Sequence, residues 1–208
     1  MTARARFLTL EGIDGAGKST HAAWIVGALR ERGHRVTATR EPGGTPLGEK
    51  LRDLLLREAM SHDSEALLMF AARREHIEQV IRPALDRGDW VVCDRFTDAT
   101  YAYQGGGYGV AVERIRALEE WIHGDCRPST TFLFDVPLAI SQERLSNQAR
   151  SGRQLDKFER ERDTFFARVR EAYLARAHAD PPRFRVVDTS RPIEVVRNEL
   201  RELLQSIR

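Results

Sequence analysis

A glycine-rich run near the start of the chain constrains the fold more than any other feature. It fits the pattern G-x-x-x-x-G-K-[ST] and reads Gly12-Ile13-Asp14-Gly15-Ala16-Gly17-Lys18-Ser19. An apolar run at 7–10 precedes it, and a helix-like segment begins near Lys18. Backbone N–H groups can surround a polyphosphate only where side chains do not intrude, which favours glycine, and the start of a helix adds further donors. This setting predicts a phosphate loop rather than a glycine-rich turn with a solvated lysine.

Composition and charge narrow the class of protein. The 33 Lys+Arg and 31 Asp+Glu residues give a net charge of +2, which provides no whole-molecule field for nucleic acid or an anionic membrane. The two cysteines, Cys93 and Cys126, lack metal-ligand spacing and are expected to be reduced thiols. No 18-residue apolar run and no signal-peptide pattern occurs. We therefore expect one soluble, cytoplasmic domain over residues 1–208 that binds neither nucleic acid nor membrane.

Strand-like and helix-like segments alternate along the chain. Apolar runs at about 7–10, 35–39, 90–93, 131–134 and 184–187 are predicted strands. Helices are expected over 20–32, 47–57, 64–85, from Pro137 to about 148, 158–179 and 193–207, with Gly33 as the C-cap of the first. This order predicts a three-layer α/β fold, with a five-stranded parallel sheet and helices on both faces.

Polar residues follow two of the predicted strands, at the edge where such sheets bind ligands. After the second strand, the run 39–45 carries charged residues with Pro42 and two glycines, although an ordinary loop is the alternative. After the third strand, Asp94 would be costly to desolvate unless it meets a cation, a donor or a metal, and Arg95 offers a planar fork for phosphate. A structural Asp-Arg pair is the alternative. The run 97–107, with hydroxyl, aromatic and amide groups and three glycines, predicts a flat pocket edge.

Two further segments leave alternatives open. Phe70 lies in the helix-like segment 64–85 with Arg73, where a core ring and a solvated arginine are the default interpretation. The charged stretch 150–157 is usually a solvated surface. In a phosphate-loop protein such a stretch can form a mobile lid, here about 146–157, whose arginines close on the transferring phosphoryl group, and we favour this interpretation.

Five segments, in this order, resemble the thymidylate kinase family of bacterial type, within the P-loop nucleoside monophosphate kinases: Glu11–Thr20, Thr39–Thr45, Leu68–Arg73, Asp94-Arg95 and Ala102–Gly107. The resemblance covers nearly the whole chain and implies the P-loop NTPase fold, a homodimer and Mg²⁺ as cofactor. It also implies transfer of the γ-phosphoryl group of ATP to dTMP, giving dTDP for dTTP biosynthesis. The alternative is another nucleoside monophosphate or deoxynucleoside kinase of the same fold.

The resemblance also implies roles for individual residues. The expected ATP-binding residues are Gly12, Ile13, Asp14, Gly15, Ala16, Gly17, Lys18, Ser19, Thr20 and Arg191. Those expected to bind dTMP are Asp14, Arg40, Glu41, Pro42, Phe70, Arg73, Arg95, Thr100, Tyr103 and Gln104. Phe70 is expected to stack on thymine, and Arg95 to hold the acceptor phosphate. The expected metal ligands are Ser19 and Asp94.

The expected catalytic residues are Lys18, Arg95, Arg150 and Arg153. The bacterial subtype places its catalytic arginine in the lid, because its phosphate loop carries none, as is the case here. Phe96 stands where many relatives have Tyr, so a role for that hydroxyl is absent. Lys157 stands where many relatives have Arg, and its point charge replaces a bidentate fork. Arg150 and Arg153 are therefore stronger candidates than Lys157 for the catalytic cation.

Overall fold

A computed structural model describes residues 6–150, 156–159, 161 and 163–207 of the chain. Its strands form one parallel sheet in the order β2-β3-β1-β4-β5. They are β1 (Phe7–Glu11), β2 (Val36–Arg40), β3 (Trp90–Asp94), β4 (Thr130–Asp135) and β5 (Phe184–Asp188). Each predicted strand is confirmed to within one residue at either end. The single sheet supports the prediction of one domain, which stays a prediction.

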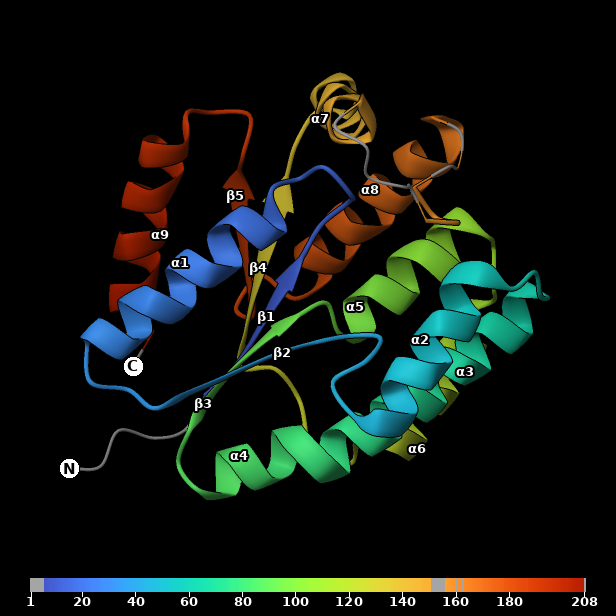
Figure 1. Ribbon diagram of the computed structural model, residues 1–208, viewed down its shortest axis with the longest axis horizontal. Helices are drawn as coiled ribbons and strands as arrows, with labels where there is room; N and C mark the ends of the chain where they lie inside the picture. Colours follow the sequence, from blue (N-terminus) through green and yellow to red (C-terminus); the bar gives the residue numbers. More distant parts are fainter. Residues whose placement is uncertain (1–5, 151–155, 160, 162, 208) are drawn as a thin grey trace.

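Helices cover both faces of this sheet (Figure 1). The α-helices are α1 (Lys18–Glu31), α2 (Pro46–Arg57), α3 (His62–His76), α4 (Arg82–Asp86), α5 (Thr97–Thr100), α6 (Val112–His123), α7 (Leu138–Arg150), α8 (Asp163–Ala179) and α9 (Ile193–Ser206). Two short π-helices, η1 (Ile77–Ile81) and η2 (Tyr101–Gly107), complete the described elements. Helices α1 and α9 lie together on one side of the sheet, and α5 and α8 lie on the other (Figure 1). No helix in the described ranges is both long and apolar enough to cross a membrane.

The alternation of side chains along β1 divides the core between two clusters. Leu8 packs in the cluster that contains Ile25 of α1 and Leu200 of α9. Its neighbour Phe7 packs in the cluster that contains Ile77 of η1. Successive strand residues point to opposite faces, so one short apolar strand anchors helices on both sides.

Most predicted helices are present, with three differences. The predicted helix at 64–85 is divided into α3, η1 and α4, and the π-helical turn ends just before Pro83, which has no N–H to donate. The predicted start of the helix at 158–179 is wrong, because Asp156 Oδ1 accepts the N–H groups of Phe158 and Glu159 at 2.9 and 3.0 Å and holds them in a turn. Helix α6 was not predicted.

The three glycines at 105–107 continue η2 instead of forming a flat pocket edge. A Cβ at Gly106 would lie 2.5 Å from Ala172 Cβ, and one at Gly107 would lie 2.4 Å from the Phe165 ring. These glycines therefore let η2 approach α8 closely. The predicted pocket edge is wrong for the glycines, which are absent from the cavity lining, whereas Thr100, Tyr103 and Gln104 do line it.

Candidate active site

A cavity of about 550 Å³ lies at the carboxyl end of the strands. It is bounded by the phosphate loop, by the segments that follow β2, β3 and β5, and by α3, η2 and α7. The predicted site residues that line it are Asp14, Gly15, Gly17, Lys18, Ser19, Thr20, Arg40, Glu41, Pro42, Arg73, Asp94, Arg95, Thr100, Tyr103, Gln104 and Arg191. Gly12, Ile13 and Ala16 belong to the phosphate loop without lining the cavity. The structure thus brings most of the residues predicted to bind ATP and dTMP to one space.

The phosphate loop takes a path that glycine permits. Gly12 has φ 138°, and a Cβ there would lie 2.3 Å from the carbonyl oxygen of Phe134. Helix α1 begins directly after Gly17, an N-cap without a side chain to bind the first N–H groups. These donors and the helix dipole favour an anion at this position.

Lys18 is folded against the loop itself. Its ammonium group donates to the carbonyl oxygens of Gly12 and Ile13 at 2.8 and 2.9 Å, and it lies 4.0 Å from the Asp14 carboxylate. Burial and the charge of Arg95 lower the pKa of Lys18 to about 8, although Asp14 acts in the opposite direction. Burial opposes ionisation of Asp14, yet the charges of Arg95 and Lys18 outweigh it and lower the Asp14 pKa. Both groups are charged near neutral pH.

Arg95 lies between the phosphate loop and the rest of the cavity. Its φ of 69° is left-handed, which costs a non-glycine residue about 1–2 kcal/mol. Nη2 donates to Asp14 Oδ1 at 2.5 Å and to the Tyr103 hydroxyl at 3.0 Å. Nη1 donates to the Gly12 carbonyl at 3.1 Å and to the Tyr173 hydroxyl at 3.2 Å. Four contacts therefore fix the guanidinium beside the loop.

Asp94 and Ser19 offer oxygen atoms suited to a magnesium ion. Asp94 Oδ1 is buried and accepts no hydrogen bond from any described group. The exposed Ser19 lies at the start of α1, and both residues line the cavity. Within the described ranges, no group of three or more His, Cys, Asp or Glu residues could hold a metal. Magnesium is commonly bound by one or two protein ligands with phosphate oxygens and waters, so this pair fits it.

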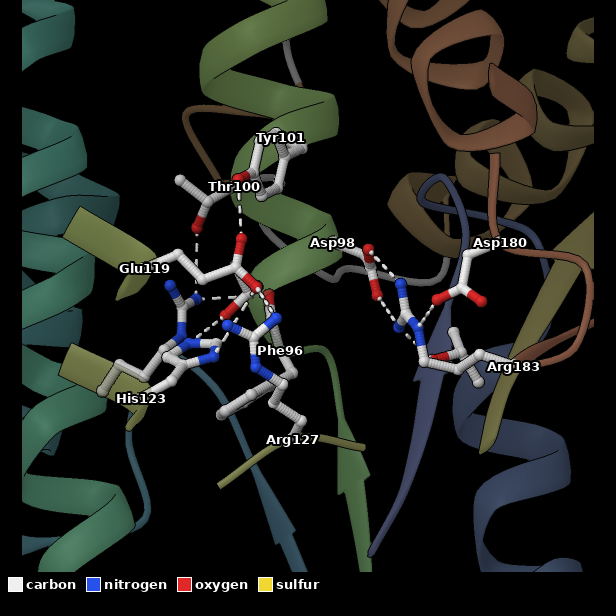
Figure 2. A network of polar contacts seen from close by, with 12 residues as sticks. Phe96, Asp98, Thr100, Tyr101, Glu119, His123, Arg127, Asp180 and Arg183 are labelled. Atoms are coloured by element: carbon white, nitrogen blue, oxygen red, sulfur yellow. Dashed lines mark hydrogen bonds and ion pairs between the residues drawn. The ribbon is translucent and has the colours of Figure 1, made fainter. Parts of the chain in front are cut away.

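Arg73 forms the far wall of the cavity and is only 2% exposed. Its Nε donates to Glu41 Oε2 at 2.7 Å, and Nη2 donates to Thr100 Oγ1 at 3.1 Å and to the carbonyl of Phe96 at 3.2 Å. Figure 2 shows Thr100 and Phe96 in this network. Nη1 is buried and has no partner among the described atoms. One strong donor therefore remains for a ligand.

Glu41 acts as the partner of Arg73. It is buried, and its other oxygen lies 2.9 Å from Nδ1 of His76, whose Nε2 lies 2.6 Å from Thr39 Oγ1. Sequence reasoning missed His76, because its contacts with 39 and 41 join segments far apart in the chain. These hydrogen bonds run from Thr39 through His76 and Glu41 to Arg73. They fix the Arg73 side chain and leave its Nη1 without a partner among the described atoms.

Phe70, which the resemblance implies stacks on thymine, lies in the apolar core next to Arg73 in this structure. It is 1% exposed, does not line the cavity, and packs in the apolar cluster that contains Phe96. The Arg73 guanidinium lies 4.7 Å from its ring centroid and so covers the ring. The structure supports the alternative interpretation of Phe70 as a core residue. Met69, Phe96 and Phe158 supply apolar wall instead.

The remaining predicted residues lie at the rim of the cavity or outside it. Arg40 is half-exposed and pairs with Glu49 at 2.9 Å. Arg191 donates to the carbonyl of Asp188 at 3.1 Å and pairs with Glu199. Arg150 is the exposed last residue of α7 and does not line the cavity, and Arg153 lies outside the described residues.

Arg144 is a cavity residue that the sequence did not indicate. Its Nη1 donates to the carbonyl of Gly15 at 3.1 Å, and its Nη2 donates to that of Thr189 at 2.8 Å. It joins the phosphate loop to the segment after β5. No motif contains it, so sequence spacing offered no signal.

Glu11 is buried directly before the phosphate loop. It accepts the Phe96 N–H at 2.7 Å and the Tyr173 hydroxyl at 2.8 Å. Burial, together with the charge of Asp98, raises the pKa of Glu11 to about 8. Its contact with Phe96 ties the start of the loop to the turn that holds Arg95. In the sequence, Glu11 directly follows an apolar run and opens the first segment of the resemblance, but neither feature predicted these contacts.

Buried polar pairs hold the segment after β3 from two sides (Figure 2). On one side, Asp98 binds Arg183 at 2.6 Å, and Arg183 also binds Asp180 at 2.8 Å. On the other side, His123 of α6 lies 2.6 Å from Thr97 Oγ1. Burial and the charges of Arg73 and Arg127 lower the pKa of His123 to about 3, so its ring is neutral at physiological pH. These contacts fix α5, which carries Thr100.

Known proteins resemble this chain in sequence and fold. The family model described as thymidylate kinase matches residues 10–200. The thymidylate kinase of Bordetella pertussis is 62% identical over 208 residues, with 98% of each chain covered, and that of Methylobacillus flagellatus is 58% identical over 205 residues, with 99% of each covered. A solved thymidylate kinase from Ehrlichia chaffeensis has a TM-score of 0.79 at 34% identity, with 98% of this chain and 99% of that chain covered. The chain, with its P-loop NTPase fold, therefore belongs to the thymidylate kinase family.

Proposed function

We propose that the chain transfers the γ-phosphoryl group of ATP to the 5′-phosphate of dTMP, giving dTDP and ADP. One observation carries this proposal: the phosphate loop and the polar pocket around Arg73 open into the same cavity, with Arg95 between them. The family and the names of the relatives support it.

The acceptor needs no general base. A phosphate monoester has a second pKa of about 6, so dTMP is largely a dianion at neutral pH. The reaction then requires relief of charge repulsion and in-line alignment. Lys18 and the N–H groups of the phosphate loop hold the β- and γ-phosphates, and Arg95 holds the acceptor phosphate.

Ser19 and Asp94 are the proposed protein ligands of Mg²⁺. The buried, unpartnered Oδ1 of Asp94 supports this assignment. The ion, when bound, supplies positive charge that neutralises the phosphate oxygens.

The pocket around Arg73 suits a base with a carbonyl at C4. The free Nη1 of Arg73 is a buried donor beside Thr100. Thymine and uracil present an acceptor oxygen at C4, whereas cytosine presents an amino group there. Leaving a buried donor unpaired costs about 1–3 kcal/mol, which favours the two 4-oxo bases.

The lid arginines and the oligomeric state belong to the same proposal. Arg150 and Arg153 supply the catalytic cation, since the phosphate loop contains no arginine. The chain forms a homodimer, supported by the exposed Leu67 of α3 and by Val112 and Trp121 of α6, of which Trp121 is 78% exposed. Activity in the cytoplasm and the absence of a nucleic-acid partner stay predictions.

A coupled assay of ADP formation tests the function. With saturating ATP and Mg²⁺, the chain is offered dTMP, dUMP, GMP and thymidine in turn. We expect dTMP to give the highest kcat/KM and thymidine to give no turnover, because it brings no phosphate for Arg95. Faster phosphorylation of GMP or thymidine would contradict the proposal in favour of another nucleotide or deoxynucleoside kinase.

A further inference from the structure

A second buried carboxylate, Glu65 of α3, joins the cavity wall to Lys157, at the end of the charged stretch 150–157. Glu65 is 1% exposed. Its Oε1 accepts a hydrogen bond from Gln104 Nε2 of η2 at 2.7 Å, and its Oε2 accepts one from the Lys157 ammonium at 2.5 Å. These residues come from three segments far apart in the chain, and none of the motifs contains Glu65.

The chemistry of Glu65 fixes which end of the Gln104 amide faces it. A carboxylate paired with a lysine only accepts hydrogen bonds, so the amide must turn its NH₂ group towards Glu65. The amide oxygen of Gln104 then points the other way, and no group in the described ranges donates to it. Gln104 lines the cavity, so this oxygen is an acceptor available to a ligand.

We infer that Glu65 is a positioning residue that selects pyrimidines carrying an N3–H group, by holding the Gln104 amide oxygen towards the cavity. The inference rests on the proposed function. Thymine and uracil carry a hydrogen on N3, which the amide oxygen accepts. Cytosine carries a lone pair on N3, which the same oxygen repels. The amide oxygen thus attracts the N3–H of thymine or uracil and repels the N3 lone pair of cytosine, and both effects contribute to the discrimination.

Lys157 makes the buried charge of Glu65 tolerable and links it to the turn at 156–159. A buried carboxylate without a cation is strongly destabilising, so the position of Lys157 matters. Asp156 accepts the N–H of Phe158, which defines the turn. The Phe158 ring then packs perpendicular to the Tyr103 ring, with centroids 5.9 Å apart. The turn thus contacts η2 directly through Phe158, and indirectly through Lys157 and Glu65, which binds Gln104.

Glu65→Gln tests the inference, because a glutamine at 65 can donate or accept and no longer fixes the Gln104 amide. We measure kcat/KM for dTMP, dUMP and dCMP. The dTMP/dCMP ratio should fall about tenfold, the value of one hydrogen bond of about 1.4 kcal/mol. The dTMP/dUMP ratio should not change, since both bases carry N3–H. A general loss of structure would not lower the dTMP/dCMP ratio while leaving the dTMP/dUMP ratio unchanged.

Asp63→Asn is the matched control. Asp63 lies in the first turn of the same helix, is 56% exposed and pairs with Arg114, away from the cavity lining. Both ratios should keep their wild-type values in this variant. In a Gln104→Leu background, Glu65→Gln should change the dTMP/dCMP ratio no further, because the group through which it acts is gone.

An unchanged dTMP/dCMP ratio in folded Glu65→Gln would overturn the inference, as would an equal fall in the Gln104→Leu background. Should Glu65→Gln not fold, the double variant Glu65→Met/Lys157→Met removes both charges together and should show the same fall, while an unchanged ratio there would also overturn the inference. Wild-type protein without dTMP activity in the same assay contradicts the proposed function. Wild-type activity with unchanged variant ratios contradicts only the role of Glu65.

Discussion

The two ends of the cavity are built in different ways. At the donor end, the phosphate loop Gly12–Ser19 and the first turn of α1 present backbone N–H groups, and the loop carries two charged side chains, Asp14 and Lys18, which lie 4.0 Å apart. At the acceptor end, buried side chains from α3, η2 and the segment after β2 form a network. In it, Arg73 is paired with Glu41, and Gln104 is paired with Glu65. Arg95 lies between the two ends and contacts the loop through Asp14 and Gly12.

This difference assigns the two ends different tasks. A cradle of backbone amides recognises any polyphosphate, because every nucleotide triphosphate carries the same groups. A pocket of buried side chains with one free donor on Arg73 and one free acceptor on Gln104 matches a particular base edge. Variants at the donor end should therefore lower turnover, whereas variants at the acceptor end should change which nucleotide is used.

The largest effect is expected from Lys18→Met. We propose that the Lys18 charge stabilises the transferring phosphoryl group, so its removal should lower kcat about 10²–10³-fold. The KM for dTMP should change little, because Lys18 lies on the donor side. Steady-state kinetics at saturating ATP measure both values. An increase of KM for dTMP as large as the loss of kcat would remove the distinction between the two ends.

Arg150→Ala and Arg153→Ala test the lid proposal. At least one of them should lower kcat on the order of 10²-fold, since a cation is lost from the transition state. Binding of dTMP, measured by calorimetry, should stay near the wild-type value. If both variants turn over at wild-type rates, the catalytic cation lies elsewhere, and Arg144, which contacts the loop at Gly15, becomes the first alternative.

Arg95→Lys tests the residue that joins the two ends. A lysine cannot keep contacts with the loop and bind a phosphate through a planar fork. We expect kcat/KM for dTMP to fall about 10–100-fold, the value of one or two charged hydrogen bonds. The KM for ATP should change less. Equal losses for both substrates would show that Arg95 supports the loop rather than the acceptor.

The smallest effect on catalysis is expected from Glu11→Gln, whose consequence appears instead in the pH dependence of stability. The folded pKa of Glu11 is about 8 against an ordinary value of 4.5, so the folded state binds more protons between these pH values. Its contribution to stability is therefore full below pH 4.5 and is lost as the pH rises towards 8. Relative to Glu11→Gln, the free energy of unfolding of the wild type should fall by at most about 1.4 kcal/mol per pH unit.

Urea unfolding at several pH values measures this difference. Asp63→Asn serves as the control for the loss of one carboxylate at an exposed position. A difference between the wild type and Glu11→Gln that does not vary with pH would contradict the assignment of Glu11.

The donor end could be predicted from the sequence because it is local. The glycines, Lys18 and Ser19 are consecutive, and the apolar runs located each strand of the sheet to within one residue at either end. The acceptor end was predicted less completely. The resemblance gave Glu41, Arg73 and Gln104. It did not give His76, which contacts Glu41, or Glu65, which contacts Gln104, because neither lies in a motif and tertiary contacts alone place them.

Two differences have a clear physical cause. Phe70 was expected at the ligand, yet helix α3 turns its ring into the apolar cluster and Arg73 covers it. The glycines at 105–107 were expected at a pocket edge, but they serve the close packing of η2 on α8. A periodic sequence pattern shows that a residue is buried or small, but it does not show which neighbouring residue it packs against.

Calorimetric titration of Lys18→Met with dTMP, without ATP, tests most directly whether the two ends of the cavity work separately. The account predicts a Kd within about twofold of the wild-type value, although the variant has lost transfer. A Kd weakened by more than about tenfold would contradict it, because the acceptor pocket would then depend on the phosphate loop for its own formation.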